Sequence, residues 1–486
     1  MKYLHELFAG APQIGIEHLS QDSRDMKEHG MFFCVKGLHY DGHQYIQNAI
    51  DKGAVCIVHS DEIETKVPGI VYITVPDVLD ALNIVADKYY DHVSSKMKVL
   101  GVTGTNGKST VSYITYQLLN RLQLNCGYIG TISIEYNDVK IPSPYTTPEA
   151  IYLHRTLHDM YEQGVQAVSM EVSSNGLDLK RTNAVVFDVG VFTNLTHEHL
   201  DFHGTMEGYL EAKKKLFYAL PLEAIAILNK DGSYYEEFAG ACKCPIVTYS
   251  LFQDADLRAD NIMMEPDSTT FVLYYKENTY VVQTNLLATF NVSNLLASIA
   301  SVMALGYPLE TILEHVNDLG QVSGRIERIE EGQNFQVIVD YAHTPDGFYK
   351  IYEYAKAITP PTSKIITVFG SAGQRDTKKR PILGKISDEY CDIIILTEED
   401  PRNESTRQIA DEIRSGISSK RTVFIESREA AIQQAIALAD KDDTVLILGK
   451  GDEDFLARDY GDEDYAGDHI VAKEALRELM EEGETL

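Results

Sequence analysis

The sequence predicts an α/β protein of three domains, and three observations support this prediction. The 486 residues exceed what one ordinary hydrophobic core accommodates. Short apolar runs alternate with helical stretches along the chain, which is typical of sheets covered by helices. A phosphate-loop pattern begins near residue 103, so the segment before it forms a separate unit. We therefore divide the chain into residues 1–96, 97–329 and 330–486.

Composition and charge restrict the partners and the compartment. The chain has 43 lysines and arginines against 73 aspartates and glutamates, a formal net charge of −30, which argues against a nucleic-acid or anionic-membrane partner. It begins without a signal sequence, lacks an apolar run of the roughly 20 residues that a membrane span needs, and spaces its cysteines unlike a zinc site. A cytoplasmic monomer is expected.

The N-terminal unit, residues 1–96, precedes the phosphate loop. Its pattern predicts strands at 30–35, 54–58 and 70–75 and helices at 45–52 and 78–90. Polar segments lie between these elements. Such segments either bind a ligand or form plain surface turns, and composition alone leaves both open.

The central unit, residues 97–329, contains the phosphate-loop pattern. A strand at 99–102 and a helix at 111–122 flank a turn whose residues are Gly104, Thr105, Asn106, Gly107, Lys108, Ser109 and Thr110. In such a turn, backbone N–H groups and the helix N-terminus bind phosphates, the lysine reaches the β- and γ-phosphates, and the serine hydroxyl binds Mg²⁺. Val102 stands where the general pattern has a glycine. A chance Gly-Lys-Ser in a surface turn is the alternative, and the flanking strand and helix argue against it.

Polar residues follow later strands of the central unit, at the edge where an open parallel sheet binds ligands. A strand at 167–171 ends at Glu171, and the segment 197–203 holds three histidines and two acids, followed by lysines at 213–215. Mg²⁺ on a triphosphate needs carboxylate ligands, and the anion needs lysines. A solvated helix end is the alternative.

The C-terminal unit, residues 330–486, predicts a second doubly wound sheet. Polar loops follow its strands at 341–345, 370–376, 399–402 and 449–453, and four such loops at one sheet edge line a cleft. Their arginines and acids suit a ligand with both ammonium and carboxylate groups. A second acidic stretch, 461–465, is expected to be a solvated loop. The expected strands are 335–340, 365–369, 393–396 and 445–448, and the expected helices are 347–357, 380–389, 406–415 and 428–439.

Taken in order, these motifs resemble the Mur ligase family, MurE type, whose members are ATP-dependent enzymes that add amino acids to the peptidoglycan precursor. The matching segments are the phosphate loop 103–109, the metal and phosphate segments 171–174 and 194–201, the nucleotide asparagines in 291–294, and the opening of the C-terminal domain at 340–343. The resemblance implies an N-terminal α/β UDP-binding domain, a central P-loop ATPase domain with a parallel sheet, and a C-terminal Rossmann-like domain that binds the amino acid.

The resemblance also implies roles at the nucleotide site. Lys108 would hold the ATP phosphates, Ser109 and Glu171 would bind one Mg²⁺, and His199 a second. Lys213 stands where the family has a lysine that CO₂ converts to N6-carboxylysine, whose carboxylate helps to bind the second metal. Lys108, His199 and Lys213 are the implied catalytic residues. The further nucleotide positions are Asn291, Asn294, Arg325, Asp340 and His343.

The other implied substrates are UDP-N-acetylmuramoyl-L-alanyl-D-glutamate and an amino acid. The D-glutamyl γ-carboxylate attacks the γ-phosphate of ATP, and the incoming amine then displaces phosphate from the acyl phosphate. The implied contacts to the UDP-sugar peptide are Ser23, Thr146, Thr147, Ser173 and Arg181, and those to the amino acid are Arg375, Asp400, Arg402, Gly449 and Glu453.

The amino acid is either meso-diaminopimelate or L-lysine. Diaminopimelate-adding members show Asp-Asn-Pro-Arg at the loop that here reads Glu399-Asp400-Pro401-Arg402. Arg402 favours diaminopimelate, because lysine has no distal carboxylate to pair with it. Asp400 favours lysine, since a carboxylate there attracts an ε-ammonium and repels a distal carboxylate. Diaminopimelate is the preferred prediction.

Two other classes of protein stay open. A folylpolyglutamate synthase shares the ATP-binding middle and the amide chemistry, but lacks a UDP-binding unit before the phosphate loop. A paralogue that binds the precursor without turning it over is the second. The presence of Lys108, Glu171, His199 and Lys213 argues against it.

Overall fold

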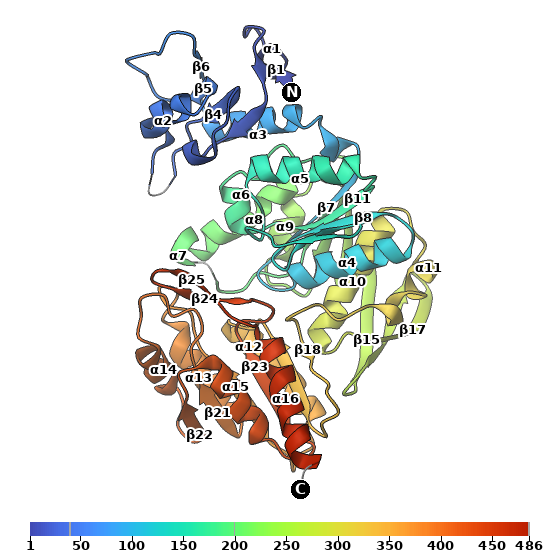
Figure 1. Cartoon of the computed structure of the whole chain (residues 1–486). Coiled ribbons are helices and arrows are strands. Elements are labelled where there is room, and N and C mark those ends of the chain that lie inside the picture. The colour runs from blue at the N-terminus through green and yellow to red at the C-terminus, as the bar shows by residue number, and fades with distance from the viewer. Residues whose placement is uncertain (38–39, 199, 485–486) are drawn as a thin grey trace.

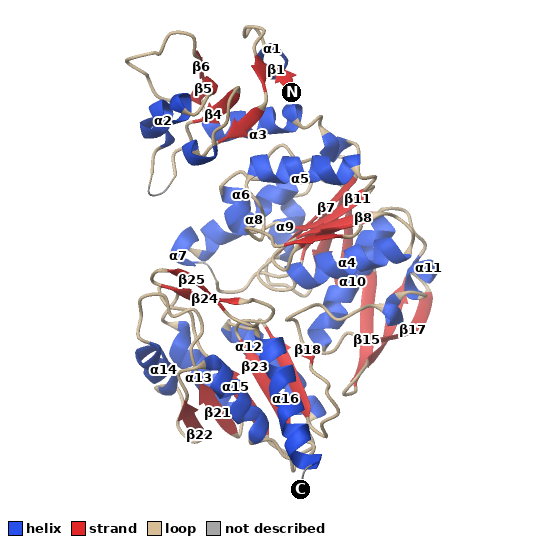
Figure 2. Ribbon diagram, viewed as in Figure 1, coloured by secondary structure: helices blue, strands red, loops and turns tan. Residues whose placement is uncertain are grey.

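The computed structural model describes residues 1–37, 40–198 and 200–484, and three larger sheets follow one another along the chain. Figure 1 shows the N-terminal part (blue) at the top, the central part below it and the C-terminal part (orange to red) at the bottom. The α/β class is confirmed, because helices cover the sheets throughout (Figure 2). Within the described ranges, no helix combines the length and the apolar character needed to cross a membrane.

The N-terminal sheet has four parallel strands in the order β3-β4-β5-β6. The elements of this part are β1 (Lys2–Tyr3), α1 (Leu4–Leu7), β2 (Gly15–Ile16), β3 (His18–Ser20), η1 (Ser23–Asp25), β4 (Gly30–Phe33), η2 (Gly42–Tyr45), α2 (Ile46–Asp51), β5 (Ala54–His59), β6 (Val71–Thr74) and α3 (Val78–Tyr89). Phe33 and Val58 of the sheet pack against Leu82 and Val85 of α3 in one core. Burial of such apolar side chains is the main force that holds the helix on the sheet.

The central sheet has eleven strands. The elements are η3 (Val93–Ser95), β7 (Lys98–Thr103), α4 (Lys108–Arg121), β8 (Cys126–Ile129), β9 (Ile134–Tyr136), β10 (Val139–Ile141), α5 (Ala150–Glu162), β11 (Ala167–Glu171), α6 (Ser174–Asp178), β12 (Val189–Phe192), α7 (Leu200–His203), α8 (Met206–Ala219), β13 (Ile225–Asn229), α9 (Tyr235–Ala241), β14 (Ile246–Ser250), β15 (Leu257–Met264), β16 (Thr269–Tyr275), β17 (Asn278–Thr284), α10 (Thr289–Ala304), α11 (Leu309–Leu313) and η4 (Val316–Asp318).

The middle of the central sheet is parallel, in the order β8-β11-β7-β12-β13-β14, so the carboxyl ends of these strands lie at one edge. One apolar core, with α4 and α10, covers one face, and a second core, with α5, α8 and α9, covers the other. Beyond β14 the sheet continues with β15, which pairs with β14 in parallel, and then with β16 and β17, which pair antiparallel. The sequence analysis did not predict this extension.

The C-terminal sheet has the order β18-β19-β23-β20-β21-β22, and all its strands except β18 run parallel. The elements are β18 (Glu327–Arg328), β19 (Gln336–Asp340), α12 (Pro345–Ile358), β20 (Ile365–Phe369), α13 (Lys379–Tyr390), β21 (Ile393–Leu396), α14 (Thr406–Arg414), β22 (Arg421–Phe424), α15 (Arg428–Ala437), β23 (Thr444–Leu448), β24 (Phe455–Arg458), β25 (Gly461–Asp464) and α16 (Asp468–Glu484). The prediction of a loop at 461–465 was wrong, because residues 461–464 form a strand that pairs with β24 in a hairpin. This strand is exposed to solvent.

A buried arginine holds the carboxyl edge of the C-terminal sheet. Arg428, at the start of α15, forms a two-pronged ion pair with Asp468 at the start of α16, with N–O distances of 2.7 and 2.6 Å. Both side chains are fully buried. The guanidinium also donates to the carbonyl oxygens of Glu398 and Leu448, at or just after the ends of β21 and β23. One side chain therefore joins segments that carry the cleft loops.

Replacement of this arginine by an apolar residue tests its structural role. Arg428→Met is expected to lower the stability of the C-terminal part by about 3–5 kcal/mol, because it leaves the Asp468 carboxylate buried without its cation. Arg407→Met, which removes an exposed partner of Asp411, is the control and should cost less than about 1 kcal/mol. Urea-denaturation midpoints followed by circular dichroism give the comparison, and equal losses would contradict it.

Candidate active site

The phosphate loop lies between β7 and α4. Gly104 and Gly107 have φ values of +152° and +86°. Residues with a Cβ atom adopt such values only with backbone strain. A Cβ atom on Gly104 would overlap Thr193 Oγ1, and one on Gly107 would overlap Asn294 Oδ1. These glycines let the loop approach the end of β12 and the start of α10 and direct the N-terminus of α4 toward the loop, where it stabilises an anion. Val102 is a buried residue of β7, which explains why the expected first glycine is absent.

Two lysines converge on one carbonyl group of this loop. Lys108 Nζ donates to the carbonyl oxygens of Gly104 (3.0 Å) and Thr105 (2.9 Å), and Lys213 Nζ, from α8, donates to the Gly104 carbonyl (2.7 Å). Desolvation lowers the pKa of both amines, and burial together with the nearby Lys108 charge lowers the pKa of Lys213 well below its usual value. Among the described residues, both amines contact carbonyl oxygens rather than carboxylates, and Lys108 offers a positive charge to an anion at this loop.

A buried carboxylate lies next to the loop at the end of β11. Ser109 Oγ donates to Glu171 Oε2 (2.9 Å), and Arg325 Nη2 donates to Ser109 Oγ (3.2 Å). The other oxygen, Glu171 Oε1, accepts from Tyr128 OH (2.9 Å) and from the Thr131 N–H (2.7 Å). The carboxylate is thus fixed, with one oxygen beside a hydroxyl. This pair of oxygen ligands suits Mg²⁺.

Seven of the twelve predicted nucleotide residues line a cavity of about 680 Å³ between the central and C-terminal parts, and Gly104, Thr105, Lys108, Ser109 and Asn291 do not. Asn294 Nδ2 donates to Asn291 Oδ1 (2.9 Å), which fixes the two amides on α10. Asp340 accepts from the N–H groups of Ile326 (2.8 Å) and Ala342 (2.7 Å), and burial raises its pKa. Predicted residues that line the cavity are Asn106, Gly107, Thr110, Asn294, Arg325, Asp340 and His343.

Contacts that the sequence analysis missed join the central part to the C-terminal part. Asn106 Nδ2 donates to Asp346 Oδ2 (2.9 Å), and His343 Nε2 lies 3.0 Å from Glu198 Oε1. The Arg325 guanidinium lies 4.3 Å from the ring centre of Tyr341. Glu198 and Tyr341 stand in polar segments that the sequence analysis named without assigning them a role, and Asp346 had only its place next to such a segment as a signal.

The residues predicted to contact the muramoyl dipeptide lie near the end of β11. The Ser173 N–H donates to Thr147 Oγ1 (2.9 Å), and Arg181 Nη1 donates to the Thr147 carbonyl oxygen (2.8 Å). Thr146 is adjacent and lines a second, larger cleft. Ser23 is buried in η1 of the N-terminal part and stands outside this chain of contacts.

All five predicted amino-acid residues line the larger cleft, which has a volume of about 1270 Å³. It extends from Thr146, Glu198 and His343 to the loops at the carboxyl edge of the C-terminal sheet. Its amino-acid residues are Arg375, Asp400, Arg402, Gly449 and Glu453. His199, a predicted metal ligand, lies outside the described residues.

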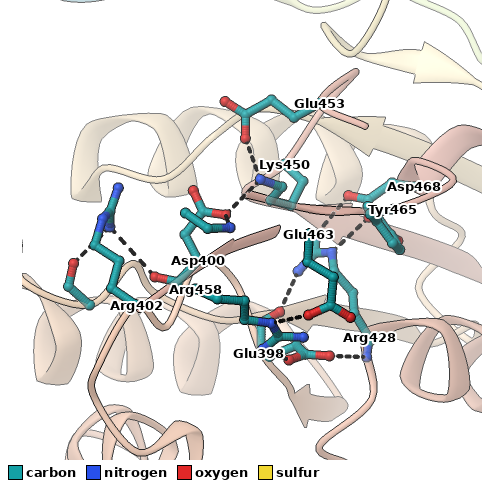
Figure 3. Close-up of polar contacts among 12 residues, drawn as sticks. Glu398, Asp400, Arg402, Arg428, Lys450, Glu453, Arg458, Glu463, Tyr465 and Asp468 are labelled. Carbon is teal, nitrogen blue, oxygen red and sulfur yellow. Dashed lines mark hydrogen bonds and ion pairs between the residues drawn. The ribbon is translucent and has the colours of Figure 1, made fainter. Parts of the chain in front are cut away.

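Asp400 carries a balanced rather than an isolated charge. Its Oδ1 accepts from Lys450 Nζ (2.8 Å) and from the Ala457 N–H (3.0 Å), and Lys450 Nζ also lies 2.6 Å from Glu453 Oε2. Figure 3 shows the Lys450 amine between the two carboxylates. The Lys450 side chain is fully buried. Lys450 therefore lies behind two lining residues of this cleft, and the sequence analysis did not select it, although it stands within the Gly449–Glu453 loop.

Sequence profiles of one family match the three parts of the chain in order. The profile described as "Mur ligase family, catalytic domain" matches residues 15–90, "Mur ligase middle domain" matches 102–302, and "Mur ligase, glutamate ligase domain" matches 324–451.

Curated relatives are similar over nearly the whole chain. UDP-N-acetylmuramoyl-L-alanyl-D-glutamate--2,6-diaminopimelate ligase 1 of Clostridium acetobutylicum is 38% identical over 480 residues, which cover 98% of this chain and 97% of the relative. The corresponding ligase of Geobacillus thermodenitrificans is 38% identical over 470 residues, 95% and 94% of the two chains. UDP-N-acetylmuramyl-tripeptide synthetase of Borreliella afzelii is 39% identical over 458 residues, 91% and 90%.

Solved structures have the same fold. A UDP-N-acetylmuramoyl-L-alanyl-D-glutamate--2,6-diaminopimelate ligase superposes with a TM-score of 0.71 at 27% identity and covers 99% of both chains. MurF ligase of Thermotoga maritima in complex with ADP has a TM-score of 0.67 at 20% identity and covers 96% of this chain and 97% of its own. The second likeness concerns the fold alone.

The fold and the phosphate-loop site define an ATP-dependent ligase. The full-length relatives and the three profiles identify its family, so the resemblance inferred from the motifs is confirmed. The chain belongs to the Mur ligase family.

Removal of the loop lysine tests the nucleotide site. Lys108→Met is expected to lower kcat/KM for ATP by at least about 10²-fold, because a preorganised cation at the phosphates is lost. Lys98→Met is the control, since Lys98 begins the same strand but is exposed and pairs with Asp188 (2.7 Å). Steady-state ATP turnover measures both variants, and a Lys108→Met enzyme as active as the control would contradict the assignment.

Proposed function

We propose that this chain adds meso-diaminopimelate to UDP-N-acetylmuramoyl-L-alanyl-D-glutamate in an ATP-dependent amide ligation. The observation that carries the proposal is the cleft of about 1270 Å³, because it joins Thr146 of the muramoyl-peptide group to all five amino-acid residues at one sheet edge. Relatives 38% identical over almost their full length carry this activity in their names.

In the proposed first step, the D-glutamyl γ-carboxylate attacks the γ-phosphate of ATP. Lys108 and Arg325 stabilise the negative charge that develops on the phosphoryl oxygens. The Lys108 amine contacts the Gly104 carbonyl oxygen of the loop, and the Arg325 guanidinium contacts the Ser109 hydroxyl. The phosphate-binding residues are Gly104, Thr105, Asn106, Gly107, Lys108, Ser109 and Thr110, and the other nucleotide residues are Asn291, Asn294, Arg325, Asp340 and His343.

The muramoyl peptide is proposed to enter from the N-terminal side. Ser23 contacts the uridine, while Thr146, Thr147, Ser173 and Arg181 orient the dipeptide. The Arg181 guanidinium lies 4.5 Å from the ring centre of Tyr145, which fixes its direction. Closure of the central and C-terminal parts around the acyl phosphate excludes water, which otherwise hydrolyses it before the amine attacks.

Mg²⁺ and CO₂ belong to the proposal. Ser109 and Glu171 fit Mg²⁺ as a hydroxyl and a buried carboxylate, and His199 is the proposed ligand of a second ion. Bound Mg²⁺ offsets the charge of the phosphates. Lys213 fits carbamylation, because only a neutral amine adds to CO₂ and its pKa is lowered by burial. The carbamate would place a carboxylate beside Lys108 and supply a further metal ligand.

Carbamylation of Lys213 predicts a spectroscopic signal independent of turnover. Protein equilibrated with ¹³C-bicarbonate should show a ¹³C carbamate resonance that is absent from Lys213→Ala. Because burial lowers the pKa of this amine, more of it is neutral at a given pH than in an exposed lysine, and the resonance should decline as acidification protonates it. Lys214→Ala is the control, since Lys214 is a neighbouring residue of α8 whose amine pairs with Glu211 (2.6 Å). Identical spectra from both variants would contradict the proposal.

Diaminopimelate is favoured over lysine by the charge balance of the cleft. Lys450 offsets the Asp400 carboxylate, so repulsion of a distal carboxylate is reduced, and Arg402 presents a guanidinium to pair with it. Arg375 and Arg402 are the proposed carboxylate partners, and Glu453 the proposed ammonium partner. L-Lysine is the second candidate, because Asp459 and Asp462 of the β24–β25 hairpin also line the cleft.

Other functions have less support. Folylpolyglutamate synthase of Mycobacterium tuberculosis has a TM-score of 0.63 at 15% identity but covers only 81% of this chain. A non-catalytic precursor-binding paralogue would have no need for the paired lysines at Gly104. We further propose a monomer in the cytoplasm with domains at 1–96, 97–329 and 330–486. The net charge of −30 opposes a nucleic-acid or anionic-membrane partner.

The decisive assay measures phosphate release from ATP and Mg²⁺. Release is expected only when both UDP-N-acetylmuramoyl-L-alanyl-D-glutamate and meso-diaminopimelate are present, with an amide product of the corresponding mass. L-Lysine replaces diaminopimelate in a parallel reaction. Release with ATP alone would indicate a simple ATPase, and silence with both amino acids would refute the proposed substrate.

A further inference from the structure

We propose that Lys450 sets the choice of the third amino acid, as a positioning residue that neutralises Asp400 and orients Glu453. The inference rests on the ligase function proposed above. It concerns which amine the cleft accepts rather than whether an amide is made.

Lys450 is placed to act on its neighbours rather than on a substrate. Its side chain is fully buried, its Nζ lies 2.8 Å from Asp400 Oδ1 and 2.6 Å from Glu453 Oε2, and it lies 4.3 Å from the ring centre of Phe455. An ammonium group has three N–H donors, and two are directed at these carboxylates. Its effect on a bound amino acid therefore passes through Asp400 and Glu453.

The Asp400 carboxylate is held on Lys450 by the surrounding backbone. The Ala457 N–H of β24 donates to the same Oδ1 atom (3.0 Å), and the Ala457 carbonyl accepts from the Arg402 N–H (2.9 Å). Asp400 and Arg402 adopt φ values of +22° and +52°, a region that costs free energy for residues other than glycine. The hairpin therefore holds a strained loop in one arrangement, with Asp400 turned to Lys450.

This arrangement leaves the adjacent arginine for a ligand carboxylate. Arg402 Nη1 donates to the Gly373 carbonyl oxygen (2.7 Å), which fixes the guanidinium, and a guanidinium carries five N–H donors in all. Glu453 is oriented from two sides, since its Oε1 accepts from Tyr341 OH (3.1 Å) and its Oε2 contacts Lys450. A distal carboxylate at Arg402 and an ammonium at Glu453 match the two charges on the distal carbon of diaminopimelate.

The same geometry predicts what happens without the Lys450 charge. Asp400 would then stand unbalanced beside Arg402, compete for its guanidinium and repel a distal carboxylate. Asp400 and Glu453 together would attract an ε-ammonium instead. One buried amine behind the lining of the cleft therefore decides between a substrate with a distal carboxylate and one without.

The first test compares Lys450→Met with the intact enzyme. We expect the ratio of kcat/KM for meso-diaminopimelate to kcat/KM for L-lysine to fall by at least about 100-fold, while KM for ATP changes less than about threefold. Lys364→Met is the matched control. Lys364 also bridges two aspartates, Asp440 (2.7 Å) and Asp443 (3.2 Å), but it lies at the opposite, amino edge of the same sheet. Its ratio should equal that of the intact enzyme.

The second test restores the charge balance of the Lys450→Met variant by also removing the charge of Asp400. The double variant Lys450→Met/Asp400→Asn should return the ratio to within about tenfold of the intact enzyme, because an amide has no charge to offset. The single variant Asp400→Asn keeps Lys450 and adds net positive charge, so its ratio should rise. The Asp400→Asn variant therefore tests the inference even if Lys450→Met does not fold.

The outcomes separate the two proposals. An intact enzyme that uses neither amino acid, or prefers lysine, overturns the proposed substrate and this inference with it. An intact enzyme that prefers diaminopimelate, with variants that lose both amino acids in proportion and show no restoration, overturns the inference alone. A ratio in Asp400→Asn that does not rise also overturns it.

Discussion

The constraint on which the catalytic centre depends is the convergence of two amines on the carbonyl oxygen of Gly104. Lys108 and Lys213 both donate to it, and among the described residues the hydrogen bonds of both amines go to carbonyl oxygens. Burial lowers the pKa of both amines, and the nearby Lys108 charge lowers the pKa of Lys213 further. The site is most stable when an anion enters it, so affinity for phosphate follows from the arrangement of the chain itself.

The elements around this centre are arranged to bring the anion's other partners to the same place. The ends of β7, β11 and β12 supply the loop, Glu171 and Asn194, because the strands are adjacent and parallel. The Asn194 side chain accepts from the Asn106 N–H (3.0 Å), and Asn106 in turn contacts Asp346 of the C-terminal part. The phosphate loop is therefore in direct contact with the domain that holds the amino-acid residues. This connection gives a physical route by which nucleotide binding favours closure of the cleft.

Sequence patterns predicted the parts of the fold that local information determines. Strands such as Ile365–Phe369 and Ile393–Leu396 are short apolar runs between polar loops, and their bounds were predicted correctly. The strands Leu257–Met264 to Asn278–Thr284 were missed, because polar residues interrupt them and the prediction relied on continuous apolar runs. The hairpin at 461–464 was missed because four acidic or small residues form a strand only through pairing with β24.

Prediction of the site residues from the sequence was limited for a different reason than prediction of the strands. The loop glycines, Lys108 and the order of motifs were evident from short spacings, so the nucleotide residues could be proposed from the sequence. The state of Asp400 could not, because its charge is offset by an amine 50 residues further along the chain. The sequence showed an extra carboxylate beside Arg402, and only the folded arrangement shows that Lys450 balances it.

The excess of acidic residues has a structural role, because several arginines and lysines are held between pairs of carboxylates. Several cations each contact two carboxylates: Arg380 contacts Glu404 and Glu412, and Arg458 contacts Glu398 and Glu463. Lys450 follows the same pattern with Asp400 and Glu453. In a chain with 73 acids and 43 bases, these cations each join two acids, whereas the buried Arg428 pairs with Asp468. Lys108 and Lys213 depart from the pattern, since their amines contact carbonyl oxygens. Lys108 therefore keeps a positive charge for the phosphates at the loop, and Arg402, which contacts the Gly373 carbonyl oxygen, keeps another at the larger cleft.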